Sequence, residues 1–318
     1  MKASRRYVLA AGVIATQLAA VSKAAILAAR TDVSEGDPLP LEPEAPPVSL
    51  ADGGEVARLG GVDLWYWELG KKGAPTIILL HPGTGSGEVW GYQAAPFADA
   101  GFRVVGYSRR GFLRSTRGDP ANPGTASDDL RLLLDHLDIR QCHIVGTAAG
   151  AFVATAFAVS WPERVASLCL ACSLLSPSDP VIGRMAASLR GPWYDGVPHD
   201  VRELAPSYRM INPQGVEKWN EFHARSRGDN PPISQPFGRP VTLDHIEQLE
   251  MPVLLVAGDA DLLSPPPIAR LLHRSIPGSE LVVIPECGHS AYWERPGLFN
   301  AAVVAFLEKH ARERARAT

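Results

Sequence analysis

A short apolar run that ends in a five-residue turn constrains the fold of this chain more than any other stretch. It reads Cys142-His143-Ile144-Val145-Gly146-Thr147-Ala148-Ala149-Gly150, and Ala-, Val- and Phe-rich helical sequence follows it. A buried strand, a tight turn framed by two glycines and a helix form the frame that presents a nucleophile in the G-x-S-x-G motif. The central residue here is Ala148, whose methyl group cannot attack a carbonyl. The sequence therefore predicts a nucleophile-presenting framework whose most reactive position is empty.

Apolar runs elsewhere in the chain predict a parallel sheet. They lie at 76–80, 103–107, 165–171, 253–257 and 281–284, and each is apolar throughout, as in strands that are covered on both faces. Gly60-Gly61 and the aromatic run after it predict a further hairpin at 58–69. Helical sequence separates many of the strands, for example at 128–137. This alternation predicts an α/β fold with a mainly parallel, doubly wound sheet.

Composition and charge narrow the function classes. The chain has 318 residues, of which 46% are hydrophobic and 20% charged, enough for one large domain. A net charge of -3 with scattered arginines argues against nucleic-acid binding. The 4 cysteines are too few and too irregular for a disulfide framework. No metal-ligand cluster or dinucleotide fingerprint is present in the sequence, so we expect no cofactor and a small-molecule substrate.

The first residues predict export. Arg5-Arg6 and the mild apolar run from Ala10 to Val21 are similar to a twin-arginine signal, which assigns residues 1–29 to an export signal. The run is Ala-rich and interrupted by Gln17, so it is weak for a permanent membrane span. We expect the protein in the bacterial periplasm or outside the cell, with no membrane span after cleavage of the signal. An uncleaved anchor and a plain N-terminal helix are the alternatives.

The remaining composition shifts divide the chain. Residues 30–55 are rich in proline and acids and predict an extended, solvated linker. The predicted α/β core covers 56–173 and 251–310, and residues 311–318 form a tail. The insertion 174–250 is rich in Pro, Arg and aromatic residues and predicts a helical cap over the site, with helices at 180–190 and 215–224.

Ligands of such sheets bind at the carboxyl ends of the strands, so the residues that follow each strand are candidates for chemistry. The strand at 76–80 is followed by His81-Pro82-Gly83, where the Gly83 N–H can point into a site. Ala149, after the turn apex, offers a second N–H, and the two together can bind an oxyanion. Asp261 follows the strand at 253–257, and His289 follows the last strand.

The order of the turn, the acid and the histidine, together with the His-Pro-Gly loop, resembles the α/β-hydrolase superfamily over roughly residues 56–310. The resemblance implies that Ala148 occupies the nucleophile position, that Asp261 is the triad acid and that His289 is the base. It also implies an ester or lactone of a small organic molecule as the substrate. Each residue taken singly has a simpler explanation, since Asp259 or Asp261 can begin a turn and a loop histidine can be a surface residue.

Ala148 permits three hypotheses. In the first hypothesis the chain is a serine hydrolase inactivated by a Ser-to-Ala replacement. Loss of the nucleophile in such an enzyme lowers turnover by on the order of a millionfold. Alternatively it is a natural enzyme in which the His289–Asp261 pair activates water or substrate, as the resemblance to aminoacrylate hydrolases and cofactor-independent dioxygenases implies. In the third hypothesis it is a non-catalytic binding protein. Ser86, Thr147 and Cys287 are weaker candidates for a replacement nucleophile.

The insertion suggests a substrate class. Aromatic side chains stand there among seven arginines, which favours an aromatic or acid-bearing small molecule; the aromatic residues are Trp193, Tyr194, Tyr208, Trp219, Phe222 and Phe237. Acids and bases are about equally numerous in this segment, so most of these charges are expected to form a solvated surface.

Overall fold

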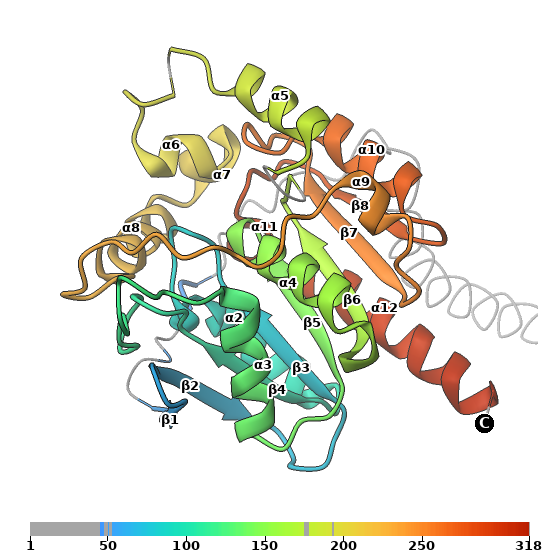
Figure 1. Cartoon of the computed structure of the whole chain (residues 1–318). Helices are drawn as coiled ribbons and strands as arrows, with labels where there is room; N and C mark the ends of the chain where they lie inside the picture. Colours follow the sequence, from blue (N-terminus) through green and yellow to red (C-terminus); the bar gives the residue numbers. More distant parts are fainter. Residues whose placement is uncertain (1–44, 48–49, 51–52, 175–177, 193, 318) are drawn as a thin grey trace, which may run out of the picture. The chain divides into compact units, whose positions relative to one another are not determined.

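The computed structural model describes residues 45–47, 50, 53–174, 178–192 and 194–317. The predicted export signal and most of the predicted linker lie outside these residues. An eight-stranded sheet forms the centre of the described chain, in the order β1-β2-β4-β3-β5-β6-β7-β8 (Figure 1). The strands are β1 Glu55–Arg58, β2 Asp63–Leu69, β3 Thr76–Leu80, β4 Arg103–Tyr107, β5 Cys142–Thr147, β6 Val165–Ala171, β7 Val253–Gly258 and β8 Glu280–Ile284.

The sheet is parallel except at one edge. β1 pairs antiparallel with β2, and β2 pairs antiparallel with β4, whereas β4, β3, β5, β6, β7 and β8 all run parallel. The antiparallel pair at the edge is the predicted hairpin. The mainly parallel sheet predicted from the apolar runs is thus confirmed.

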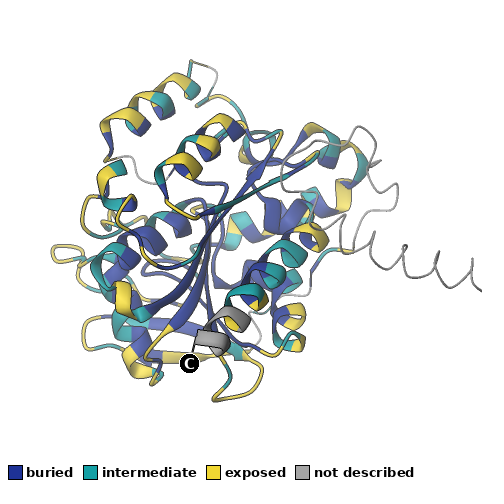
Figure 2. Ribbon diagram, turned by 90° about the vertical axis from the view of Figure 1, so that its right-hand side faces the viewer, coloured by how far each residue is buried: buried dark blue, intermediate teal, exposed yellow. Residues whose placement is uncertain are grey.

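Helices cover both faces of the sheet because successive strand residues point to opposite sides. On one face, strand residues such as Ile78 and Ile144 pack against α3 (Ala126–His136), α4 (Ala149–Ser160) and α10 (Pro266–Ser275). On the other face, residues such as Leu79 and Val145 pack against α2 (Gly91–Asp99) and α12 (Pro296–Ala317). Figure 2 shows the strands as buried and the helices with exposed residues on their outer sides. The doubly wound arrangement is confirmed.

The two glycines around Ala148 are required by close packing at the start of α4. A Cβ atom on Gly146 would lie 2.7 Å from the carbonyl oxygen of Gly150. A Cβ atom on Gly150 would overlap the carbonyl oxygen of Leu80 on the neighbouring strand β3. Neither position has room for a side chain. Glycine at both positions therefore lets the start of α4 pack closely against β3 and β5.

Short helices make up most of the insertion, coloured from yellow-green to orange in Figure 1. They are α5 Pro180–Leu189, α6 His199–Glu203, α7 Pro206–Ile211, α8 Pro213–Arg225 and α9 Leu243–Ile246. The helices predicted at 180–190 and 215–224 correspond to α5 and α8. The remaining helical elements among the described residues are η1 Gly87–Trp90, η2 Pro162–Arg164 and α11 Ala291–Glu294.

The aromatic residues of the insertion mostly serve packing. Tyr208, Trp219 and Phe222 are buried in the core that α2 and α12 cover, and Phe237 packs edge-on against Phe152. These side chains stabilise the insertion, so they do not support the aromatic-substrate hypothesis. Trp193 lies outside the described residues.

The ends of the described chain differ from the sequence-based boundaries. β1 begins at Glu55, which the sequence assigned to the linker, and Tyr92 donates a hydrogen bond to the Ala45 carbonyl at 2.5 Å, so part of the predicted linker contacts the core. α12 continues to Ala317, so residues 311–317 of the predicted tail are helical. No helix in the described part of the chain is long and apolar enough to cross a membrane.

Candidate active site

Strand register aligns the ends of the central strands at one edge of the sheet. Leu80 of β3 is opposite both Tyr107 of β4 and Gly146 of β5, and Gly258 of β7 is opposite Ile284 of β8. The loops after β3 and β5 therefore start side by side, and so do the loops after β7 and β8. These four loops carry all five residues that the sequence predicted for the site.

Ala148 lies at the apex of the turn between β5 and α4. Its backbone has φ 49° and ψ -116°, in the left-handed region that residues other than glycine rarely adopt. The Ala148 N–H donates to the carbonyl of Ala171 at 3.0 Å, which ties the strained turn to β6. This is the backbone conformation that holds a nucleophile out of a strand-to-helix turn, and it presents a methyl group here.

Gly83 and Ala149 are neighbours, as the oxyanion-hole prediction requires. A Cβ atom on Gly83 would lie 3.7 Å from the Ala149 Cβ atom. Among the described residues no group accepts a hydrogen bond from either N–H. Ala149 is also the first residue of α4, where the helix dipole favours negative charge. The pair can therefore stabilise a developing oxyanion.

Buried contacts hold the loop that contains Gly83. The Arg109 guanidinium donates to the Pro82 carbonyl at 3.1 Å, and the Arg109 N–H donates to Nε2 of His81 at 3.0 Å. Burial and the nearby Arg109 charge lower the pKa of His81 well below its ordinary value. His81 is therefore neutral and accepts the hydrogen bond that fixes the loop.

His289 and Asp261 form the predicted pair. Nδ1 of His289 lies 2.9 Å and 3.0 Å from the two carboxylate oxygens of Asp261, and both residues are buried. The nearby Asp259 instead accepts from the backbone N–H of Cys287 at 3.2 Å. Of these two aspartates, Asp261 is the one that contacts His289.

Charge coupling shifts both pKa values of this pair. Burial alone would raise the pKa of Asp261, but the charge and hydrogen bond of His289 outweigh it and hold the pKa below its ordinary value. Burial alone would lower the pKa of His289, but Asp261 raises it above its ordinary value. Nε2 of His289 has no hydrogen-bond partner among the described residues, so this nitrogen is available to accept a proton from water.

Three residues that support the pair were missed by the sequence analysis. Ser264 donates its hydroxyl to Asp261 at 2.6 Å, and its backbone N–H donates to the same carboxylate at 2.9 Å. Glu294 accepts hydrogen bonds from the backbone N–H groups of Gly288 and Ser290, on either side of His289. The backbone carbonyl of Glu203, a residue of the insertion, accepts a hydrogen bond from the backbone N–H of His289 at 2.7 Å. An Asp-x-x-Ser turn could have indicated Ser264, whereas no local pattern indicates the other two.

The candidate replacement nucleophiles are not positioned for that role. Ser86 and Thr147 are fully buried, and neither hydroxyl has a hydrogen-bond partner in the described part of the chain. Burial raises the pKa of the Cys287 thiol well above its ordinary value, which disfavours the reactive thiolate. Among the described residues the His289 imidazole contacts Asp261 and Ser264, and none of the three candidates hydrogen-bonds to it.

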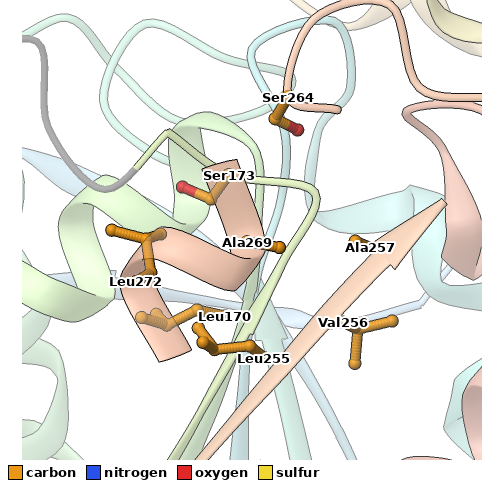
Figure 3. Close-up of a pocket in the computed structure, with 8 residues that line it drawn as sticks. All are labelled: Leu170, Ser173, Leu255, Val256, Ala257, Ser264, Ala269 and Leu272. Carbon is orange, nitrogen blue, oxygen red and sulfur yellow. The ribbon is translucent and has the colours of Figure 1, made fainter. Parts of the chain in front are cut away.

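A small pocket lies among β6, β7 and α10, next to Ser264 (Figure 3). Its lining is mostly apolar and consists of Leu170, Ser173, Leu255, Val256, Ala257, Ser264, Ala269 and Leu272. Neither Ala148 nor His289 lines it, so we do not assign the substrate to this pocket. Within the described ranges, no cluster of His, Cys, Asp and Glu side chains could hold a metal ion.

Known proteins resemble the chain over most of its length. It is 28% identical over 262 residues to the 2-hydroxy-6-oxononadienedioate/2-hydroxy-6-oxononatrienedioate hydrolase of Escherichia coli K12, covering 75% of this chain and 88% of that protein. An esterase from Thermogutta terrifontis, solved with malate bound, superposes with a TM-score of 0.67 at 26% identity, over 84% of this chain and 99% of that one. The enol-lactonase from Burkholderia xenovorans LB400 shares the fold, with a TM-score of 0.63 at 22% identity, over 80% and 100% of the two chains.

The model of the alpha/beta hydrolase family matches residues 77–302, which include the Ala148 turn, Asp261 and His289. The match covers more than half of the chain and agrees with the parallel, doubly wound sheet. This chain belongs to the alpha/beta hydrolase family.

Proposed function

We propose that the protein hydrolyses a small carbonyl compound, an ester or lactone, with water as the nucleophile in place of a serine. The observation that carries this proposal is the His289–Asp261 hydrogen bond at the same edge of the parallel sheet as the turn whose apex is Ala148. Asp261 fixes the tautomer with hydrogen on Nδ1, so Nε2 is the basic nitrogen. In this proposal His289 is the base, Gly83 and Ala149 are the oxyanion donors, and water takes the place of a protein nucleophile.

The proposed reaction follows from these groups. Nε2 of His289 takes a proton from water while the water oxygen adds to the carbonyl carbon. The negative charge that forms on the carbonyl oxygen is bound by the N–H groups of Gly83 and Ala149. Collapse of the tetrahedral intermediate breaks the bond to the leaving group, which departs with a proton, and the imidazolium gives up the proton it took from water, so that His289 is neutral again. Asp261 remains ionised and stabilises the imidazolium.

The relatives support a carbonyl substrate of this kind. Their names refer to an oxo-dienedioate, an ester and an enol lactone, and each of these compounds contains a carbonyl carbon that water can attack. Hydrolysis of a 2-hydroxy-6-oxo-dienedioate would break a C–C bond beside a ketone. This reaction should therefore be tested as well. The proposed base, His289, and the two oxyanion donors, Gly83 and Ala149, suit either reaction.

A second candidate is a serine hydrolase in which alanine has replaced the nucleophile. The strained backbone of Ala148, at φ 49°, favours this hypothesis, because such a conformation is useful for presenting a reactive side chain and alanine has none. In that case Ala148→Ser restores a complete triad, and turnover of esters rises by on the order of 10³-fold or more.

One set of variants separates the hypotheses. The unchanged protein, Ala148→Ser, His289→Ala and the control Ala151→Ser, which adds a hydroxyl to a buried alanine of α4, are assayed with an ester, a lactone and a 2-hydroxy-6-oxo-dienoate. The proposal predicts turnover by the unchanged protein that falls at least about 10²-fold in His289→Ala. Turnover only in Ala148→Ser supports the second candidate. Saturable binding without turnover in either form contradicts both and leaves a binding protein.

A further inference from the structure

Glu203, the last residue of α6, connects the two halves of the site. Its carboxylate oxygen Oε2 accepts from the Thr84 hydroxyl at 2.9 Å, and Thr84 follows the oxyanion residue Gly83. Its backbone carbonyl accepts a hydrogen bond from the backbone N–H of His289 at 2.7 Å. Glu203 therefore contacts both the loop after β3, which contains Gly83, and the loop after β8, which contains His289.

The carboxyl group of Glu203 differs from those of the other buried acids. Glu88 is paired with Arg225, Asp129 with Arg110, and Asp261 with His289. Asp179 and Glu294 each accept from three backbone N–H groups. Among the described residues, the carboxyl group of Glu203 accepts a hydrogen bond only from the Thr84 hydroxyl, through Oε2. Its other oxygen, Oε1, has no hydrogen-bond partner there, and no described cation forms an ion pair with the carboxyl group.

A buried carboxyl with so few donors favours its neutral form. Burial raises the pKa of Glu203 above its ordinary value, although His289, the Thr84 hydroxyl and His223 lower it, and Asp261 adds to the rise. The residue is 6% exposed. Near neutral pH the protonated fraction is therefore larger than for a surface glutamate, and its O–H can be donated.

We propose that Glu203 is a second proton-transfer group of this site and that it protonates the leaving group while His289 activates water. The inference rests on the proposed hydrolysis. The water proton goes to Nε2 of His289 and the hydroxide adds to the carbonyl carbon. When the bond to the leaving group breaks, the leaving oxygen takes the proton of Glu203. The imidazolium then returns its proton to the Glu203 carboxylate, so both groups are restored.

The alternative role for Glu203 is a passive tie between the two loops. Glu203→Gln separates the roles, because the amide oxygen can still accept from Thr84 while the acidic proton is lost. Thr84→Val is the matched variant, since it removes the tie and leaves the acid. Both are measured on two esters of one acid, a p-nitrophenyl ester whose leaving anion is stable and an alkyl ester whose leaving alkoxide needs a proton.

For Glu203→Gln we expect kcat/KM for the alkyl ester to fall by about 10²-fold or more, the usual contribution of general acid catalysis, with the p-nitrophenyl ester nearly unchanged. The decline of alkyl-ester hydrolysis at high pH should also disappear. Thr84→Val should lower both substrates by the same factor. An equal loss for both esters in Glu203→Gln would overturn the acid role while leaving the proposed function intact.

The measurement uses the unchanged protein, in which the proposed function predicts turnover. If the unchanged protein hydrolyses neither these esters nor a lactone, the proposed function fails and the role of Glu203 fails with it. The two failures are therefore distinguishable from the data.

Discussion

Ala148 combines the backbone of a reactive residue with a side chain that has no reactive group. The positive φ angle, the contact to Ala171 and the flanking glycines are all retained. An alanine gains nothing from this strain, which is of the order of 1–3 kcal/mol for a non-glycine residue in a rare backbone region. At the residue scale, the proposed chemistry therefore has to come from His289 and Asp261 and not from the side chain of Ala148.

We predict that the pKa of His289 depends on the charge of Asp261. Asp261→Asn removes the charge that raises the pKa but leaves the burial that lowers it, so the pKa should fall below its ordinary value. Imidazole NMR titration measures this directly, without reference to activity. Asp259→Asn is the control, because it removes a carboxylate of the same loop that contacts the Cys287 backbone and not His289, so the pKa of His289 should stay close to that of the unchanged protein.

The same shift sets the pH dependence of activity. His289 must be neutral to accept a proton from water, so kcat/KM should rise with pH through the raised pKa of His289. In Asp261→Asn this rise should move to lower pH, with a lower plateau because the tautomer is no longer held. A pH profile that is identical in the two proteins would contradict the assignment of His289 as the base.

At the scale of secondary-structure elements, one ion pair holds α8 of the insertion to η1 of the core. Nε of Arg225 lies 2.7 Å from Oε1 of Glu88, whose side chain is 0% exposed, and the guanidinium also lies 4.2 Å above the ring of Phe222. His223 of α8 makes a second contact, with Nδ1 3.0 Å from the Thr84 carbonyl. The insertion therefore contacts the loop that follows Gly83 through two helices, α6 and α8.

We predict that Arg225→Met destabilises the protein by about 1–3 kcal/mol, since it leaves the buried Glu88 carboxylate without its arginine partner. The double variant Arg225→Met/Glu88→Gln should recover part of the loss, because the buried charge is then gone. Urea unfolding of the two variants and the unchanged protein measures the difference. Equal stability of all three proteins would show that the pair contributes nothing.

At the scale of the whole molecule, export stays a prediction, since the signal at residues 1–29 lies outside the described residues. The 4 cysteines are free and buried, so the fold does not depend on a compartment that forms disulfides. Such a chain can fold before transport. We propose that it crosses the membrane by the twin-arginine route.

The twin arginines can be tested without changing the charge. Replacing Arg5 and Arg6 by lysine should retain the protein in the cytoplasm of an expressing bacterium, because this route requires the arginine pair. Lys23→Arg is the control and should leave the distribution unchanged. Fractionation of the cells measures both, and a periplasmic Arg5→Lys/Arg6→Lys protein would refute the prediction.

Much of the fold and part of the site could be read from sequence because their signals are local. The continuous apolar runs predicted the parallel strands, and the two glycines predicted the turn in which Gly150 packs against Leu80. His289 and Asp261 could be named because each lies in the loop after a strand, where the ligands of a parallel sheet bind, and because their order along the chain resembles that of the α/β-hydrolase superfamily.

Other features depended on contacts between distant residues. The role of Glu203 follows from its hydrogen bond to Thr84, 119 positions away, and no spacing in the chain encodes that contact. The burial of Trp219 and Phe222, which gives these side chains a packing role, also depends on how α8 packs against the core. Periodicity and turn residues act over a few positions, so the sequence by itself determined the strands, the elbow and the residues at the strand ends. Only the tertiary structure decided which buried acid meets which base, because that depends on the three-dimensional packing of the insertion.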